Sequence, residues 1–234
     1  MKIILLSHAG GSATLFFSFL KEFLNEKEMK FIDYRGHGSR ITEVLCDNFD
    51  EMINDVLINF LENVDPGEKY LIIGHSLGAY IGFHLEKILE TKFGYQAKNL
   101  LISGIEPIEY PILKLGQLSE LTDEKFISEI ERFGGLEPHL FQNEDFKEFA
   151  LPILRSDFKV IESMNNRFKK EIVKSPITVV NGTNDKYEID NLLRWKLYSD
   201  NNVEFIFLNG GHFYINENKK EFAEIVKKLM REEK

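Results

Sequence analysis

A serine lies at the centre of Gly74-His75-Ser76-Leu77-Gly78, a stretch that matches the G-x-S-x-G pattern. In this pattern the serine sits on a sharp strand-to-helix turn, and the glycines remove Cβ atoms that would clash there. The pattern is weakly specific in isolation. Here the apolar run 70–73 precedes it, and a helix to about Glu90 is predicted after it. We therefore predict that Ser76 is a nucleophile rather than a surface serine in a tight turn.

A serine nucleophile needs a base that takes its proton, and three histidines follow Ser76 in the chain. His84 lies on the helix directly after the turn and is too close in sequence to reach back. His139 lies in a stretch of helical character. His212 directly follows the last predicted strand, within Gly210-Gly211-His212-Phe213, and such loops carry the active-site groups of open α/β sheets. We predict that His212 is the base.

A carboxylate that orients the base is expected between the serine and the histidine in the chain. Asp185 directly follows the strand predicted at 177–181 and is our choice. Asp190, inside the next predicted helix, and Glu188 remain alternatives. Aspartate also caps helices well, and Asp185 can combine both roles.

Hydrolysis of an acyl group also needs two backbone N–H groups directed at the oxygen that becomes negative. One is expected from Leu77, the residue after the nucleophile. The other is expected from His8-Ala9-Gly10-Gly11, which follows the first predicted strand and resembles the HGGG-type loop of lipases. Ala9 is the predicted donor, with Gly10 next, and a plain glycine turn is the alternative.

Strands and helices alternate along most of the chain, which predicts a mostly parallel central sheet with helices on both faces. With the serine motif between a strand and a helix, and the acid and histidine after it in the chain, this pattern predicts an α/β-hydrolase fold. Residues 106–174 break this alternation, because they contain no strand-like run and have helical character. We expect them to form a helical lid inserted into a core made of residues 1–105 and 175–234. The strands are predicted at 3–6, 29–34, 70–73, 99–103, 177–181 and 203–208, and the helices at 14–24, 49–64, from the serine turn to about Glu90, at 188–198 and near the C-terminus.

Composition excludes several classes of protein. The formal net charge of −9 makes the chain a poor nucleic-acid binder, because phosphate backbones need a clustered basic surface. The single cysteine, Cys46, rules out a disulfide framework or a multi-cysteine zinc site. No apolar run is long enough to span a bilayer, and the N-terminal run is too short for a signal peptide. We expect a cytoplasmic monomer that needs no metal or cofactor.

Four segments of the chain carry a specific resemblance. They are His8-Ala9-Gly10-Gly11-Ser12-Ala13, Gly74-His75-Ser76-Leu77-Gly78-Ala79, Leu151-Pro152-Ile153-Leu154-Arg155-Ser156-Asp157-Phe158 and Gly210-Gly211-His212-Phe213. Together they are similar to the type II (external, editing) thioesterases of nonribosomal peptide and polyketide synthases. The resemblance covers nearly the whole chain, and the third segment, a lid signature, is the most selective. The chain departs from the family after its second strand, where Arg35-Gly36-His37-Gly38-Ser39-Arg40 replaces a Pro-Gly-Arg-type motif.

The resemblance implies hydrolysis of acyl groups from the phosphopantetheine arm of an acyl- or peptidyl-carrier protein, which would be the partner. It offers Gly10, Phe133, Leu136, Leu151, Leu154 and Phe158 as residues that line the substrate, although the lid residues among them can equally hold the lid helices together. A small-molecule carboxylester hydrolase or lipase of the same fold is the main alternative. A ligand-binding relative without catalysis is the other, and it usually lacks a residue of the catalytic set.

Overall fold

Six parallel strands form the centre of the computed structural model, which describes residues 1–107, 118–132, 138–164 and 171–231. Their order across the sheet is β2-β1-β3-β4-β5-β6. The predicted fold class and all six predicted strands are confirmed. The strands are β1 (Lys2–Leu6), β2 (Met29–Ile32), β3 (Tyr70–His75), β4 (Asn99–Ser103), β5 (Ile177–Gly182) and β6 (Val203–Leu208).

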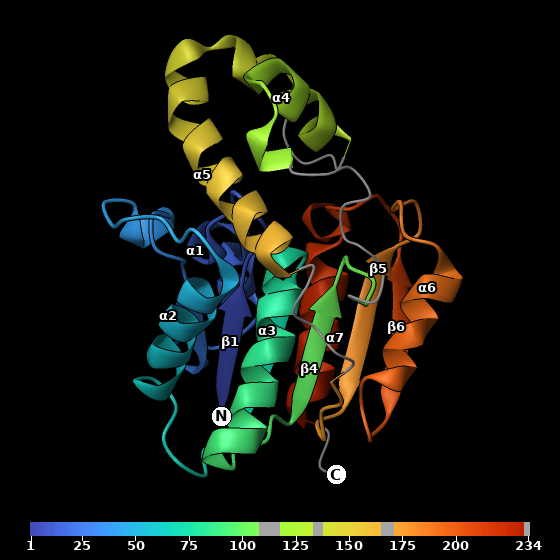
Figure 1. Ribbon diagram of the computed structural model, residues 1–234. Helices are drawn as coiled ribbons and strands as arrows, with labels where there is room; N and C mark the ends of the chain where they lie inside the picture. The colour runs from blue at the N-terminus through green and yellow to red at the C-terminus, as the bar shows by residue number, and fades with distance from the viewer. Residues whose placement is uncertain (108–117, 133–137, 165–170, 232–234) are drawn as a thin grey trace.

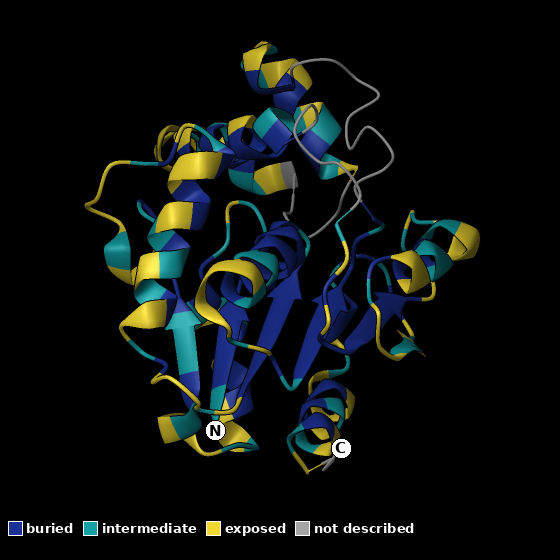
Figure 2. Cartoon of the chain, turned by 60° about the horizontal axis from the view of Figure 1, so that its bottom comes forward, coloured by how far each residue is buried: buried dark blue, intermediate teal, exposed yellow. Residues whose placement is uncertain are grey.

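Helices cover both faces of this sheet (Figure 1). Because side chains alternate along a strand, Ile4 and Leu6 of β1 enter one apolar core while Ile3 and Leu5 enter the other. The first core is closed by α2 and α3, and the second by α7. Figure 2 shows the central strands buried while the helices expose their outer sides, and the two edge strands, β2 and β6, contain partly exposed residues. The helices are α1 (Ala13–Phe16), α2 (Phe49–Leu61), α3 (Leu77–Ile88), α4 (Asp123–Glu131), α5 (Glu144–Met164), α6 (Ile189–Leu193) and α7 (Lys219–Arg231).

Short helical turns fill many of the connections. The helix predicted at 14–24 is in fact two pieces, because Phe17 leaves the helical conformation between α1 and the turn that follows. Among the described residues, no helix is both long and apolar enough to cross a membrane. The turns are η1 (Ser18–Glu22), η2 (Glu26–Glu28), η3 (Gly38–Arg40), η4 (Leu89–Phe93), η5 (Leu118–Glu120), η6 (Pro138–Gln142), η7 (Arg194–Leu197) and η8 (Tyr214–Asn216).

The strand order reverses direction between β1 and β3. From β1 the chain goes to β2 on one side, and from β3 it proceeds to β4, β5 and β6 on the other. In open parallel sheets, ligands bind at the carboxyl ends of the strands at such a reversal. The loop after β1 and the turn after β3 are the two segments that carry the predicted oxyanion donors and the predicted nucleophile.

Between β4 and β5, the described residues form helices and helical turns over 118–120, 123–131, 138–142 and 144–164, joined to the strands by irregular segments. The two long helices, α4 and α5, lie above the carboxyl ends of the strands (Figure 1). Helix α5 contains Pro152 and buries Leu154, Asp157 and Phe158 in its second half. The predicted limits of this insertion, 106 and 174, stay a prediction.

A buried carboxylate joins several segments at the amino ends of the strands, opposite the predicted site. Glu86 of α3 has no exposed surface and accepts hydrogen bonds from the Tyr70 hydroxyl (2.8 Å), the Ala97 N–H (2.7 Å) and the Ser175 hydroxyl (2.5 Å). Burial raises the pKa of Glu86 to about 7, because removing a carboxylate from water disfavours its charged form more than these donors favour it.

This carboxylate predicts a fall in stability with rising pH. The folded-state pKa of Glu86 is raised, so its stabilising effect is complete below the ordinary value of 4.5 and is lost as the pH rises through about 7. Between pH 5 and pH 8, the free energy of unfolding should fall by about 2 to 3 kcal/mol on this account. In Glu86→Gln, urea unfolding should show a fall in the free energy of unfolding over this pH range that is smaller than that of the wild type by the same amount. Equal slopes in the two proteins would show that Glu86 does not titrate in this range.

Candidate active site

The turn between β3 and α3 holds Ser76 in strained backbone. Its φ of 54° and ψ of −117° make it the one non-glycine residue with positive φ in the described part of the chain. The flanking glycines allow this turn: a Cβ on Gly74 would lie 2.2 Å from the Gly78 carbonyl oxygen, and one on Gly78 would lie 2.3 Å from that of Leu6. The second approach also places the start of α3 against the end of β1. The local sequence therefore builds the elbow that exposes a serine hydroxyl.

His212 and Asp185 are brought together from the loops after β6 and β5. His212 Nδ1 lies 3.0 Å from Asp185 Oδ2, and both side chains are almost fully buried. Because a carboxylate only accepts, Nδ1 carries the proton and Nε2 is left to accept one. The ring of His75, the residue before Ser76, lies 5.0 Å from that of His212, between centroids. A histidine held by a carboxylate in this way is the pair that a serine nucleophile needs as base and orienting acid.

The alternative residues lie elsewhere. Asp190 and Glu188 are exposed at the start of α6, and among the described residues neither contacts His212. His84 is on α3 and pairs with Glu171 (3.2 Å). His139 is in the turn η6 of the insertion. These placements favour His212 and Asp185 over the rivals that the sequence left open.

Two backbone N–H groups near Ser76 are available to a substrate oxygen. The Gly11 N–H donates to the His8 carbonyl (3.0 Å), so residues 8–11 form a turn, and Gly10 at its third position has a φ of 73°. The Gly10 N–H is already used, because it donates to Asp157 Oδ2 (2.6 Å). Within the described residues the N–H groups of Ala9 and Leu77 make no hydrogen bond. The geometry therefore supports Ala9 over Gly10 as the donor that complements Leu77.

A buried hydrogen-bond chain, not foreseen from the sequence, supports the elbow and the histidine loop together. His75 Nδ1 pairs with the Ser103 hydroxyl (2.8 Å), which pairs with the Tyr214 hydroxyl (2.7 Å), and Tyr214 donates to the Val180 carbonyl (3.1 Å). Burial, and to a smaller extent His212, lower the pKa of His75 well below its ordinary value. A neutral His75 therefore packs beside His212, and this chain fixes the ends of β3, β4 and β5 relative to the loop after β6.

The insertion contacts the site through its second long helix. A Cβ on Gly10 would lie 2.4 Å from Leu154 Cδ2, so the Leu154 side chain covers the turn after β1. Phe158 is buried and packs edge-on against Phe126 of α4 (5.4 Å between ring centroids). Leu154 thus meets the site directly, whereas Phe158 packs within the insertion. Phe133 and Leu136, also predicted to line the substrate, lie outside the described residues.

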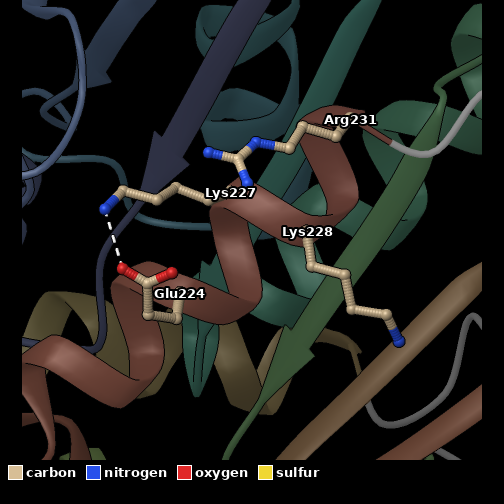
Figure 3. A pocket seen from close by; sticks show the side chains of 4 residues that line it. All are labelled: Glu224, Lys227, Lys228 and Arg231. Atoms are coloured by element: carbon tan, nitrogen blue, oxygen red, sulfur yellow. Dashed lines mark hydrogen bonds and ion pairs between the residues drawn. The ribbon is translucent and has the colours of Figure 1, made fainter.

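Other chemistry finds little support. Burial raises the pKa of the Cys46 thiol, which disfavours the reactive thiolate. Among the residues that the structure describes, no cluster of three His, Cys, Asp or Glu side chains is placed to hold a metal ion. Figure 3 shows a hollow on the surface of α7, lined by Glu224, Lys227, Lys228 and Arg231, where Lys227 pairs with Glu224 (2.7 Å). It contains none of the predicted site residues.

A parallel sheet with a strained serine at a strand–helix elbow, and a histidine–carboxylate pair on two later loops, defines an α/β hydrolase. The thioesterase domain family matches residues 1–230. The chain belongs to that family and is a thioester hydrolase.

Relatives from biosynthetic pathways align over almost the whole chain. Thioesterase PikA5 of Streptomyces venezuelae is 29% identical over 219 residues, which cover 93% of this chain and 76% of the relative. The gramicidin S biosynthesis protein GrsT of Aneurinibacillus migulanus is 28% identical over 234 residues, with 99% and 89% coverage. The crystal structure of ClbQ from the colibactin NRPS/PKS pathway shares the fold, with a TM-score of 0.87 at 24% identity and coverage of 98% and 97%.

Proposed function

We propose that this protein hydrolyses acyl groups from the phosphopantetheine arm of carrier proteins in nonribosomal peptide, polyketide or related acyl-chain synthesis. The observation that carries the chemistry is the strained Ser76 together with the backbone N–H groups of Ala9 and Leu77, which make no hydrogen bond within the described parts of the chain. The choice of substrate is supported by PikA5 and GrsT, since GrsT is named for gramicidin S biosynthesis and both align with the insertion as well as the core.

Acylation of the serine is the first half of the proposed reaction. His212 Nε2 takes the proton of the Ser76 hydroxyl, and Oγ attacks the thioester carbonyl carbon. The carbonyl oxygen becomes negative and accepts hydrogen bonds from the Ala9 and Leu77 N–H groups. Asp185 holds the imidazole ring and stabilises its charged form. The C–S bond then breaks, and the pantetheine sulfur leaves with the proton from His212.

Hydrolysis of the acyl-serine is the second half. His212 takes a proton from water, the hydroxide adds to the ester carbonyl, and the same two N–H groups stabilise the second oxyanion. The C–Oγ bond breaks, Ser76 regains its proton, and the free acid departs. Because a thiolate is a good leaving group, the first half needs less help from a general acid than cleavage of an amide would.

We further propose that residues 106–174 act as a lid over this site. Helices α4 and α5 lie above the carboxyl ends of the strands (Figure 1). The Leu154 side chain covers the turn that carries Ala9. Leu154 is therefore the lid residue best placed to contact an acyl chain. A carrier protein would present its phosphopantetheine arm beneath this insertion.

Competition between three butyryl donors tests the choice of substrate. We expect kcat/KM to be highest for a butyryl-carrier protein thioester, lower for butyryl-CoA and lowest for a butyryl oxyester. Recognition of the carrier protein adds binding energy that butyryl-CoA cannot provide, and the oxyester has a poorer leaving group than either thioester. The assay follows release of butyrate by the purified protein, with Ser76→Ala as the blank. Equal or faster turnover of the oxyester would favour a carboxylester hydrolase instead.

A further inference from the structure

Asp157 of α5 has no exposed surface, yet it reaches out of the insertion to two loops of the core. Its Oδ2 accepts the Gly10 N–H at 2.6 Å, across a separation of 147 residues. The same oxygen lies 3.0 Å from Nε2 of His37, a buried residue in the loop after β2. One carboxylate oxygen therefore joins the insertion, the turn that carries Ala9 and the neighbouring loop.

The Gly10 bond bears on the orientation of one peptide group. Gly10 is the third residue of the turn formed by residues 8–11, and its φ of 73° is the value typical of a type II turn. Type I and type II turns differ by a flip of the central peptide, here the one between Ala9 and Gly10. A flip would bring the Ala9 carbonyl oxygen toward the Asp157 carboxylate in place of an N–H group. Asp157 thus favours the present turn and fixes its position against α5. The Ala9 N–H belongs to the preceding peptide, so Asp157 acts on it by holding the turn in place rather than by turning the N–H group itself.

His37 supplies the counter-charge. Its Nδ1 lies 3.0 Å from the Arg35 carbonyl and its Nε2 faces the carboxylate. Both partners accept, so both ring nitrogens carry protons and the ring is positive. Burial alone would lower the pKa of His37, but the Asp157 carboxylate and, to a smaller extent, the Arg35 carbonyl and Asp33 together outweigh that effect and raise the pKa above its ordinary value. A buried charge needs such a partner, since removing either member leaves the other uncompensated.

The other acid near this loop has different partners. Asp33 accepts hydrogen bonds from the side chains of Ser12, Thr14 and Ser39 and from the N–H groups of the last two. Asp33 therefore joins the loops after β1 and β2 but makes no hydrogen bond to Gly10. Asp157 Oδ1 is buried and has no hydrogen-bond partner in the described part of the chain. A buried polar atom without a partner lowers the stability of the fold. Attaching α5 to the core is therefore not a sufficient reason for a carboxylate at position 157.

We propose that Asp157 is a positioning residue, which holds the Ala9–Gly10 peptide in place and so aligns the Ala9 N–H with the developing oxyanion. This role rests on the proposed function of Ala9 as an oxyanion donor. It makes the geometry of the oxyanion hole depend on the position of α5. Asp157 acts through the backbone and does not touch the substrate.

Removal of the carboxylate should affect the transition state more than substrate binding. With the small thioester butyryl-N-acetylcysteamine as substrate, kcat of Asp157→Ala should fall about 10²-fold, near the effect of removing one oxyanion donor. KM should stay near the wild-type value, because the oxyanion does not exist in the bound substrate. Asp157→Asn keeps an acceptor oxygen for the Gly10 N–H and should recover part of kcat.

An alkyl trifluoromethyl ketone gives a readout that a purely structural role would not change. Ser76 adds to its carbonyl, and the resulting hemiketal oxyanion occupies the same hole. The affinity of Asp157→Ala for this ketone should fall by the same factor as kcat/KM. Ser156→Ala is the matched control, because the adjacent Ser156 hydroxyl bonds the Cys46 carbonyl (2.5 Å) and so fastens the same helix without touching Gly10.

Three results would overturn the inference: wild-type kcat and ketone affinity in folded Asp157→Ala, a change in KM alone, or an equal loss in Ser156→Ala. If the alanine variant does not fold, Asp157→Leu, which keeps the branching at Cγ without the bond, is measured by the same criteria. Binding of the ketone needs no carrier protein. A wild-type protein that binds it but leaves carrier thioesters intact would refute the proposed substrate and not the role of Asp157.

Discussion

Ser76→Ala should lower kcat by about 10⁴- to 10⁶-fold, the range seen when the nucleophile of a serine hydrolase is removed. The reason is that the elbow directs the Ser76 hydroxyl at the carbonyl, and the acyl-serine cannot form without this hydroxyl. Alanine fits the strained φ of 54° as well as serine does, so the fold should persist. Release of butyrate from a butyryl thioester measures the loss, and circular dichroism checks the fold.

Covalent labelling tests the same point independently of substrate choice. A fluorophosphonate should add one label to the wild-type protein, at Ser76, and none to Ser76→Ala. Ser18→Ala is a suitable control, because Ser18 is exposed and bonds only the Leu15 carbonyl (2.7 Å) within the described residues. Hydrolysis by Ser76→Ala within tenfold of wild type would refute the nucleophile, and an unlabelled wild type would favour a ligand-binding relative.

Asp185→Asn should reduce kcat by about 10⁴-fold with little change in KM, as loss of the orienting carboxylate does in other serine hydrolases. The carboxylate accepts from His212 Nδ1 at 3.0 Å and so keeps the proton off Nε2. An asparagine amide can donate to Nδ1 instead, which leaves the proton on Nε2 and removes the base. Steady-state kinetics on butyryl-N-acetylcysteamine measures the effect.

Asp190→Asn is the matched control for this substitution. It makes the same chemical change on an exposed residue of α6, four positions before Arg194, and should leave kcat near wild type. The opposite result, a large loss in Asp190→Asn and a small one in Asp185→Asn, would transfer the role of the acid to Asp190.

The fold could be predicted because its signals are local. Each strand is a short apolar run that ends at a turn, and the elbow needs only the five residues around Ser76. The prediction of one continuous helix at 14–24 was wrong, because the chain forms two short helical pieces there. Phe17 is buried in the core beneath α7, whereas Phe16 packs against His8 (4.7 Å between ring centroids) and His75. The helix is interrupted at Phe17, and the two neighbouring side chains lie in these different surroundings.

The finer geometry of the site depends on contacts between distant residues and could not be predicted. The sequence placed Asp157 in a lid signature, but nothing local indicates that its side chain reaches Gly10. The same holds for Ser103 and Tyr214, which look like an ordinary strand serine and loop tyrosine until the sheet brings them together (2.7 Å). Pairing of strands selects these partners, and pairing is set by the whole fold rather than by spacing.

The parallel order of the strands also governs when the protein gains its chemistry during synthesis. The residues proposed for catalysis follow β3, β5 and β6, and β5 joins the sheet beside β4 only after the long insertion between them has been made. Contacts of such sequence separation form late, because the intervening loop must close first. A nascent chain that ends before β6 carries the serine without its histidine. Hydrolytic activity should therefore emerge only after β6 and the loop that carries His212 have been made.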